Sequence, residues 1–118
     1  MIRACLVCMT MILSARAQTT VPELFKAAVE AQQRGELDRA VDAYRKLLSL
    51  EPRLVDARGN LGAALAKLGR LEEAIAEYNT ALKQEPANKP VRMNLALAHY
   101  KRRDFTQAVE HFTVLHKT

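Results

Sequence analysis

The residue types that most often carry chemistry are sparse in this sequence of 118 residues, and their spacing fits no common catalytic or metal-binding pattern. The two cysteines, Cys5 and Cys8, form a Cys-x-x-Cys pair, but no second ligand pair and no following helix start accompany it. No cysteine follows residue 8, which excludes a disulfide framework or a four-thiolate zinc site in the rest of the chain.

The three histidines are also poorly placed for joint chemistry. His111 and His116 are five residues apart on one expected helix, a spacing that does not put two ligands on the same face. His99 falls where a packing side chain is expected, so we interpret it as a half-buried residue between two helices. The sequence has no glycine-rich phosphate loop, no Gly-x-Ser-x-Gly and no His-Glu-x-x-His. We therefore expect no enzymatic activity, no bound metal and no cofactor.

Charged residues have simpler explanations. The glutamates between positions 72 and 77 would lie at the start of one helix, where the positive end of the helix dipole stabilises carboxylates. The cations at positions 101–103 would lie at the end of another helix, where the negative end of the dipole stabilises them. The formal charge of +5 falls to +3 without Arg3 and Arg16, which lie in a segment that we expect to be removed. So small a charge, spread over several helices, argues against a nucleic-acid partner.

The N-terminal segment has the layout of a secretory signal peptide. Arg3 precedes an uncharged, mostly apolar run over residues 4–13, and Ala15-Arg16-Ala17 follows it. The run is shorter than the roughly 20 residues that span a bilayer. We predict a signal peptide over residues 1–17, export to the periplasm or outside the cell, and a single domain over residues 18–118. The alternatives are an uncleaved N-terminal membrane anchor or a buried first helix.

Several residue types recur every 34 positions. Prolines, glycines, small residues and large apolar residues all keep this period, as shown by Pro52/Pro86, Gly35/Gly69, Ala28/Gly62/Ala96, Ala40/Ala74/Ala108, Leu37/Leu71/Phe105, Val41/Ile75/Val109 and Tyr44/Tyr78/Phe112. A period of 34 residues, in a chain rich in good helix formers, is the length of a helix-turn-helix repeat. The repeats cover residues 21–54, 55–88 and 89–118.

The second repeat resembles the tetratricopeptide repeat (TPR) family. Residues 60–62 (Asn-Leu-Gly), residues 69–75 (Gly-Arg-Leu-Glu-Glu-Ala-Ile), Tyr78 and Glu85-Pro86 carry the resemblance. It implies an all-α fold, an α-solenoid of three helix-turn-helix units with about six antiparallel helices in a right-handed superhelix. The sequence departs from the family pattern where Leu24, Arg58 and Arg92 replace an aromatic residue and where Arg103 replaces a glycine, and we expect these departures to weaken local packing.

Capping signals place the expected helices at about 21–33, from after Gly35 to Leu50, and at about 54–68, 71–84, 89–102 and 105–116. The expected N-caps are Thr20 with Glu23, Asn88 and Asp104. The expected breaks between helices are Gly35, Pro52, Gly69 and Pro86. The small residue on the first helix of each unit is expected to face the small residue on the second, so that Gly62 would lie against Ala74.

The resemblance further implies a concave groove lined by the first helix of each unit. Its family positions correspond to Phe25, Val29, Gln32, Gln33, Gly59, Asn60, Ala63, Ala66, Lys67, Met93, Asn94, Leu97, Tyr100 and Lys101. This surface would be apolar and would suit an extended or helical peptide. Some TPR domains instead clamp a terminal carboxylate, but only Asn60 matches that set, while Phe25, Val29, Pro90 and Asn94 stand where other groups are needed.

We therefore predict a non-catalytic protein-interaction scaffold that binds a peptide or partner protein in its groove. The alternative is a homo-oligomerising module, or the N-terminal part of a longer TPR protein, that associates through its uncapped C-terminal helix. In that helix we expect Val114 to face water where a further helix would lie. Either Phe112 or Leu115, whichever does not pack inward, would be exposed with it.

Overall fold

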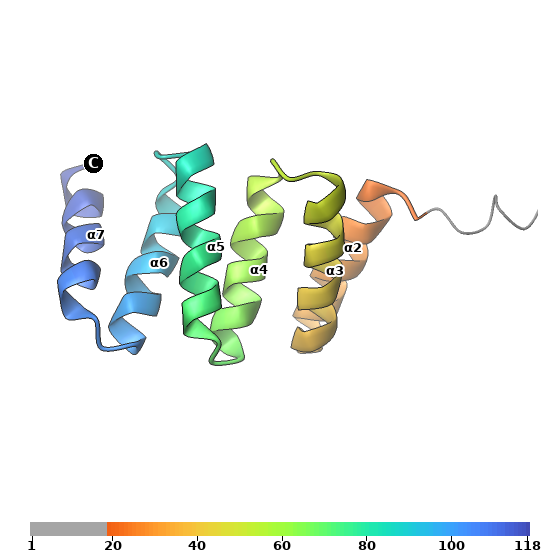
Figure 1. Ribbon diagram of the computed structural model, residues 1–118, viewed down its shortest axis with the longest axis horizontal. Helices are drawn as coiled ribbons and strands as arrows, with labels where there is room; N and C mark the ends of the chain where they lie inside the picture. The colour runs from red at the N-terminus through yellow and green to blue at the C-terminus, as the bar shows by residue number, and fades with distance from the viewer. Residues whose placement is uncertain (1–18) are drawn as a thin grey trace, which may run out of the picture.

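The computed structural model describes residues 19–118, which form six α-helices. They are α2 (Val21–Gln33), α3 (Leu37–Leu50), α4 (Val55–Lys67), α5 (Leu71–Gln84), α6 (Lys89–Lys101) and α7 (Phe105–Lys117). Figure 1 shows them standing side by side in one row, in chain order from α2 to α7. The expected all-α solenoid is confirmed, with each helix boundary within one residue of its expected position. The predicted signal peptide lies outside the described residues.

The helix starts follow the local sequence. Before α2, the Thr20 side chain accepts a hydrogen bond from the Glu23 backbone N–H, and the Glu23 carboxylate accepts one from the Thr20 N–H at 3.2 Å. Before α6, the Asn88 side chain accepts from Val91 N–H, and before α7 Asp104 accepts from Gln107 N–H. These bonds satisfy backbone donors that have no partner within the helix, and they confirm the three expected N-caps.

The turn inside each helix pair has the same backbone shape. Gly35 and Gly69 have φ of +76° and +79°, in the left-handed region that glycine adopts without strain. Arg103 takes their place in the third pair with φ of +67°. The residue after each of them donates its N–H to a carbonyl five residues back at 2.9 Å, namely Glu36 to Ala31, Arg70 to Leu65 and Asp104 to His99. The third turn therefore keeps the left-handed conformation and its hydrogen bond, although a non-glycine residue such as Arg103 disfavours a positive φ.

The core runs through the row as a series of small residues and tyrosines. Tyr44 and Tyr78 are fully buried, and so are the alanines at the repeating small positions. A Cβ atom at Gly62 would lie 2.5 Å from Tyr78 Cε1, so the ring of Tyr78 occupies the space that a side chain at position 62 would need. Glycine at this position thus makes room for an aromatic ring across the pair.

Burial falls toward the last helix. The α5 helix has five buried residues, whereas α7 has Ala108 alone. Val109 is 62% exposed, while the residues one and two repeats earlier, Ile75 and Val41, are 7% and 1% exposed. Val114 is exposed as expected, but it lies at the repeat position of Lys46 and Thr80, which are not buried in the earlier pairs either. The residue left open where a further helix would pack is therefore Val109, not Val114.

Candidate peptide-binding groove

The expected groove residues lie on α2, α4 and α6, the first helices of the three pairs. On α6, the side chains of Met93, Leu97 and Tyr100 are exposed, which is unusual for residues of their size and apolar character. They follow one another at intervals of four and three residues and therefore share one face of the helix. On α2, Phe25 and Val29 are half-buried and pack against the core.

Two hollows mark this surface. One, of about 170 Å³, lies between α4 and α6 and is lined by Ala63, Ala66, Lys67, Tyr78, Asn94, Leu97, Ala98 and Lys101. The other, of about 300 Å³, is lined by Phe25, Val55, Asp56, Gly59, Asn60, Asn88, Pro90, Val91 and Asn94. Asn94 borders both hollows. The structure thus brings residues of all three pairs together along one surface.

Small residues on α4 set the depth of the groove. Ala63 and Ala66 have short side chains, so Tyr78 also lines the smaller hollow. Gly59 has a similar role, since a Cβ atom there would lie 3.3 Å from Val91 Cγ2. Burial raises the pKa of Tyr78 to about 12, so its hydroxyl stays neutral at physiological pH. The floor is therefore uncharged.

Not every expected groove residue is free to bind. The hydroxyl of Tyr44 donates a hydrogen bond to Gln32 Oε1 at 2.6 Å, so the Gln32 side chain is already bonded within the first helix pair. Phe25 packs edge-on against the Tyr44 ring, with centroids 6.5 Å apart. Gln33 is exposed and borders neither of the two hollows. Of the expected residues of the first pair, only Phe25 borders one of the two hollows.

The charges beside the groove differ between its two hollows. Lys67 and Lys101 are exposed and border the smaller hollow, on α4 and α6. Asp56 and the amides of Asn60 and Asn88 border the larger one. A ligand that spans both hollows would therefore meet cations at one and a carboxylate at the other.

A second cluster of titratable side chains was missed at the sequence level. The rings of His99 on α6 and His111 on α7 are stacked, with centroids 5.7 Å apart and planes at 12°. Arg92 Nη1 lies 3.2 Å from His111 Nδ1, and Arg92 Nη2 donates to the Pro86 carbonyl at 3.0 Å. Aligning the repeats could have revealed this cluster, because Arg92 and His111 fall at the positions of Arg58 and Glu77.

The equivalent cluster in the second pair is a conventional ion pair. Arg58 Nη1 donates to Glu77 Oε2 at 2.8 Å, and Arg58 Nη2 donates to the Pro52 carbonyl at 3.0 Å. The third pair keeps both arginine contacts but replaces the carboxylate with an imidazole. Burial, with added repulsion from Arg92 and His99, lowers the pKa of His111, although Glu110 opposes this shift.

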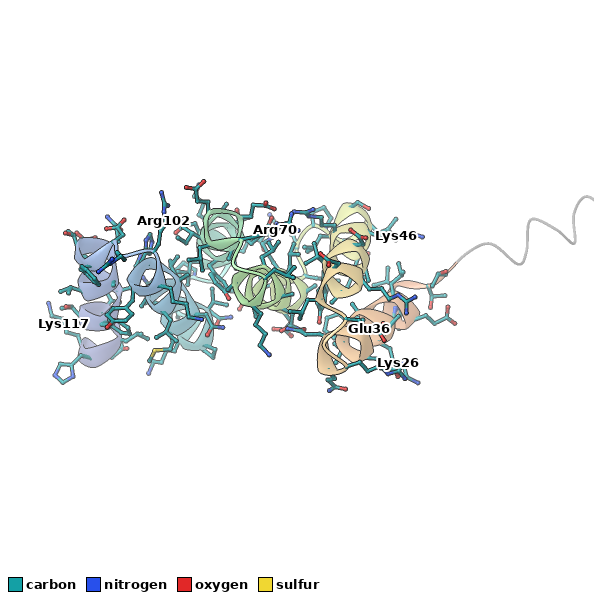
Figure 2. The ribbon with its side chains drawn as sticks, turned by 90° about the horizontal axis from the view of Figure 1, so that it is seen from below. Lys26, Glu36, Lys46, Arg70, Arg102 and Lys117 are labelled. Carbon is teal, nitrogen blue, oxygen red and sulfur yellow. The ribbon has the colours of Figure 1, made fainter. Side chains whose placement is uncertain are left out.

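The remaining chemistry within residues 19–118 is limited. No three histidine, cysteine, aspartate or glutamate side chains of this part of the chain come close enough to hold a metal ion. The ion pairs Arg45–Glu73 and Glu72–Arg102 instead connect one helix pair to the next, and Figure 2 shows Arg70 and Arg102 on the same edge of the row. Within the same residues, no helix has the length and apolar character needed to cross a bilayer.

Comparison with known proteins gives consistent results. Residues 25–89 and 76–115 match the family described as tetratricopeptide repeat. Comparison with curated proteins returns no match.

Two groups of solved structures are similar in both sequence and fold. MamA AMB-1 is 28% identical with a TM-score of 0.78, and the alignment covers 84% of this chain and 54% of MamA. The TPR2B domain of yeast Sti1, solved in complex with pHsp70, is 27% identical with a TM-score of 0.74, covering 77% of this chain and 73% of the domain. The chain thus spans about half the length of MamA.

Proposed function

Because the chain belongs to the tetratricopeptide repeat family, we propose that it is a non-catalytic interaction module that binds a peptide segment of a partner protein along the groove of α2, α4 and α6. The observation that carries the proposal is the exposed apolar face of Met93, Leu97 and Tyr100 beside a hollow floored by small residues. An exposed patch of this kind, bordered by polar residues, is typical of a protein-interaction site.

The chemistry of the groove suggests what the peptide carries. A large apolar side chain would fill the hollow between Ala63, Ala66 and Leu97. An acidic side chain close to it in the peptide would reach Lys67 and Lys101. Opposite charges of this kind favour orientation and rate of binding more than affinity.

The similarity to the Sti1 domain supports a peptide ligand in general but not a clamped C-terminal carboxylate. Of the residues that such a clamp needs, only Asn60 is matched here. Phe25 and Val29 are half-buried and apolar, and Asn94 carries no charge. We therefore propose recognition of internal apolar side chains.

A displayed library of random peptides tests the proposal. Peptides selected on the parent protein should bind with a Kd at least about tenfold higher to Leu97→Ala and Tyr100→Ala, the loss expected for a binding hot spot of about 1.4 kcal/mol or more. Leu50→Ala is the matched control, because Leu50 is an exposed aliphatic residue on α3, outside the groove.

Circular dichroism should show the same helix content in all three variants. If both groove variants bind the selected peptides as tightly as the parent, the interaction surface lies elsewhere on the molecule. If the Leu50 control loses binding as well, the effect is not specific to the groove.

We further propose that the protein is exported, on the basis of the Arg3, apolar run and Ala15-Arg16-Ala17 layout. Intact mass spectrometry of the protein from its native host tests this. A chain that begins at Gln18 and is found outside the cytosol is the expected result, and a cytosolic chain that begins at Met1 would contradict it.

A further inference from the structure

The α7 helix carries a stripe of three apolar residues and a histidine at positions that the earlier pairs bury or half-bury. The stripe consists of Phe105, Val109, Phe112 and His116, at steps of four, three and four residues along one face of the helix. On α3 the same positions are Leu37, Val41, Tyr44 and Leu48, and on α5 they are Leu71, Ile75, Tyr78 and Leu82. The helix α4 packs on α3, and α6 packs on α5. Phe105 and Val109, by contrast, are more than half exposed.

The opposite end of the row is not complementary to this stripe. At three repeat positions α4 and α6 carry buried apolar residues, namely Ala57, Leu61 and Ala64 on α4 and Val91, Leu95 and Ala98 on α6. The same positions on α2 are Glu23, Ala27 and Glu30, none of which is buried. Glu23 accepts a hydrogen bond from the Thr20 N–H, and Glu30 lies 4.0 Å from Lys26. A second copy stacked head to tail would therefore place charged groups against an apolar stripe, where their burial is unfavourable.

The stripe is instead complementary to itself. In an antiparallel pairing of two α7 helices around the point between residues 110 and 111, Val109 meets Phe112 of the second copy and Phe105 meets His116. The same symmetry brings Asp104, at the start of one helix, to Lys117, at the end of the other. Antiparallel helices also place opposite dipole ends together. Figure 1 shows α7 as the last helix of the row, with one helix neighbour, so a second copy can approach it.

We propose that two copies of this chain associate tail to tail through the α7 stripe in a closed, two-fold dimer. Such an interface uses the same patch on both copies, so the assembly closes at two. The ring of Phe105 packs edge-on against the ring of Tyr100, with centroids 5.6 Å apart, so the stripe adjoins the groove at this contact. The inference does not depend on the proposed peptide ligand.

Sedimentation of the full chain over a wide concentration range tests the proposal. The parent should shift from monomer to dimer without larger species. Val109→Glu should raise the dimer Kd by at least about 30-fold, the loss typical of a residue at the centre of an interface. Val114→Glu is the matched control, because Val114 is also exposed on α7 but outside the stripe, and it should leave the Kd within about twofold of the parent.

A mixture of variants tests the symmetry. Two copies of Val109 lie close together at the proposed axis, so Val109→Glu and Val109→Lys should each be monomeric, and an equal mixture of the two should associate again. A parent chain that stays monomeric at all concentrations would overturn the proposal and favour a helix of another protein on the stripe. A dimer that ignores Val109→Glu, or open-ended assembly, would overturn it too.

Discussion

The second and third helix pairs have the same order of helices and the same turn shape, but different side chains stabilise them. In the second pair the turn residue is Gly69, the arginine faces Glu77, and Ile75 is covered by the following helix. In the third pair the turn residue is Arg103, the arginine faces His111, and Val109 is open to solvent. All three differences remove stabilising interactions or add strain in the third pair. Stability is therefore expected to fall along the row, as in other repeat proteins where each unit depends on its neighbours.

The largest expected effect is overpacking of the tightest contact. Gly62→Leu should lower the free energy of unfolding by about 1–3 kcal/mol, because even a Cβ atom there collides with the Tyr78 ring. The equivalent change Ala96→Leu should have a smaller effect, since Phe112 is only half-buried and α7 is free to shift. Chemical denaturation followed by circular dichroism measures both. Equal losses in the two pairs would show that the third pair is as tightly packed as the second.

An intermediate effect is expected at the third turn. Arg103→Gly should raise the stability of the third pair by about 1 kcal/mol, because a non-glycine residue is disfavoured at φ of +67°. The reverse change, Gly69→Arg, should lower stability by a similar amount in the second pair. Hydrogen exchange of α6 and α7 amides detects the local gain. If Arg103→Gly leaves exchange unchanged, the arginine side chain makes a compensating contact.

The smallest effect is a dependence on pH. The pKa of folded His111 is lowered from its ordinary value of 6.5, so unfolding takes up a proton in mildly acidic solution. The free energy of unfolding should therefore fall modestly as the pH drops below about 6.5, and level off below the folded pKa. Protonation also removes the acceptor that faces Arg92.

His111→Glu serves as the matched variant, because it copies the Arg58–Glu77 arrangement of the second pair. It should abolish the decline that begins below about pH 6.5 and move the acid sensitivity to the range where carboxylates titrate. Denaturation midpoints measured at several pH values give the comparison. An unchanged decline in His111→Glu would assign it to another group.

The period of 34 residues predicted the helix pairs, and the resemblance to the TPR family predicted how the pairs stack. Gly35, Pro52, Gly69 and Pro86 mark where helices end. The resemblance also placed the groove positions on the first helices, and residues of α4 and α6 line one hollow there. Whether these residues bind a ligand stays a prediction.

Contacts between helices were harder to predict from the sequence. A register shows which face a residue occupies but not how far its side chain reaches, and the reach of the Tyr78 ring to Gly62 was not predicted. His99 and His111 were considered one helix at a time, so their stacking across α6 and α7 was not foreseen. Comparing Val114 with Lys46 and Thr80 would have shown that it lies outside the buried stripe.

The single row of helices has a mechanical consequence. When a force is applied between residues 20 and 117, it passes through every helix interface in series, because the row has little contact between helices that are not consecutive. Of the six described helices, α7 has the fewest buried residues, so it is expected to detach first. The molecule would extend stepwise under tension from its C-terminal end, and α6, which carries the exposed apolar face of the groove, would lose its C-terminal neighbour in the first step.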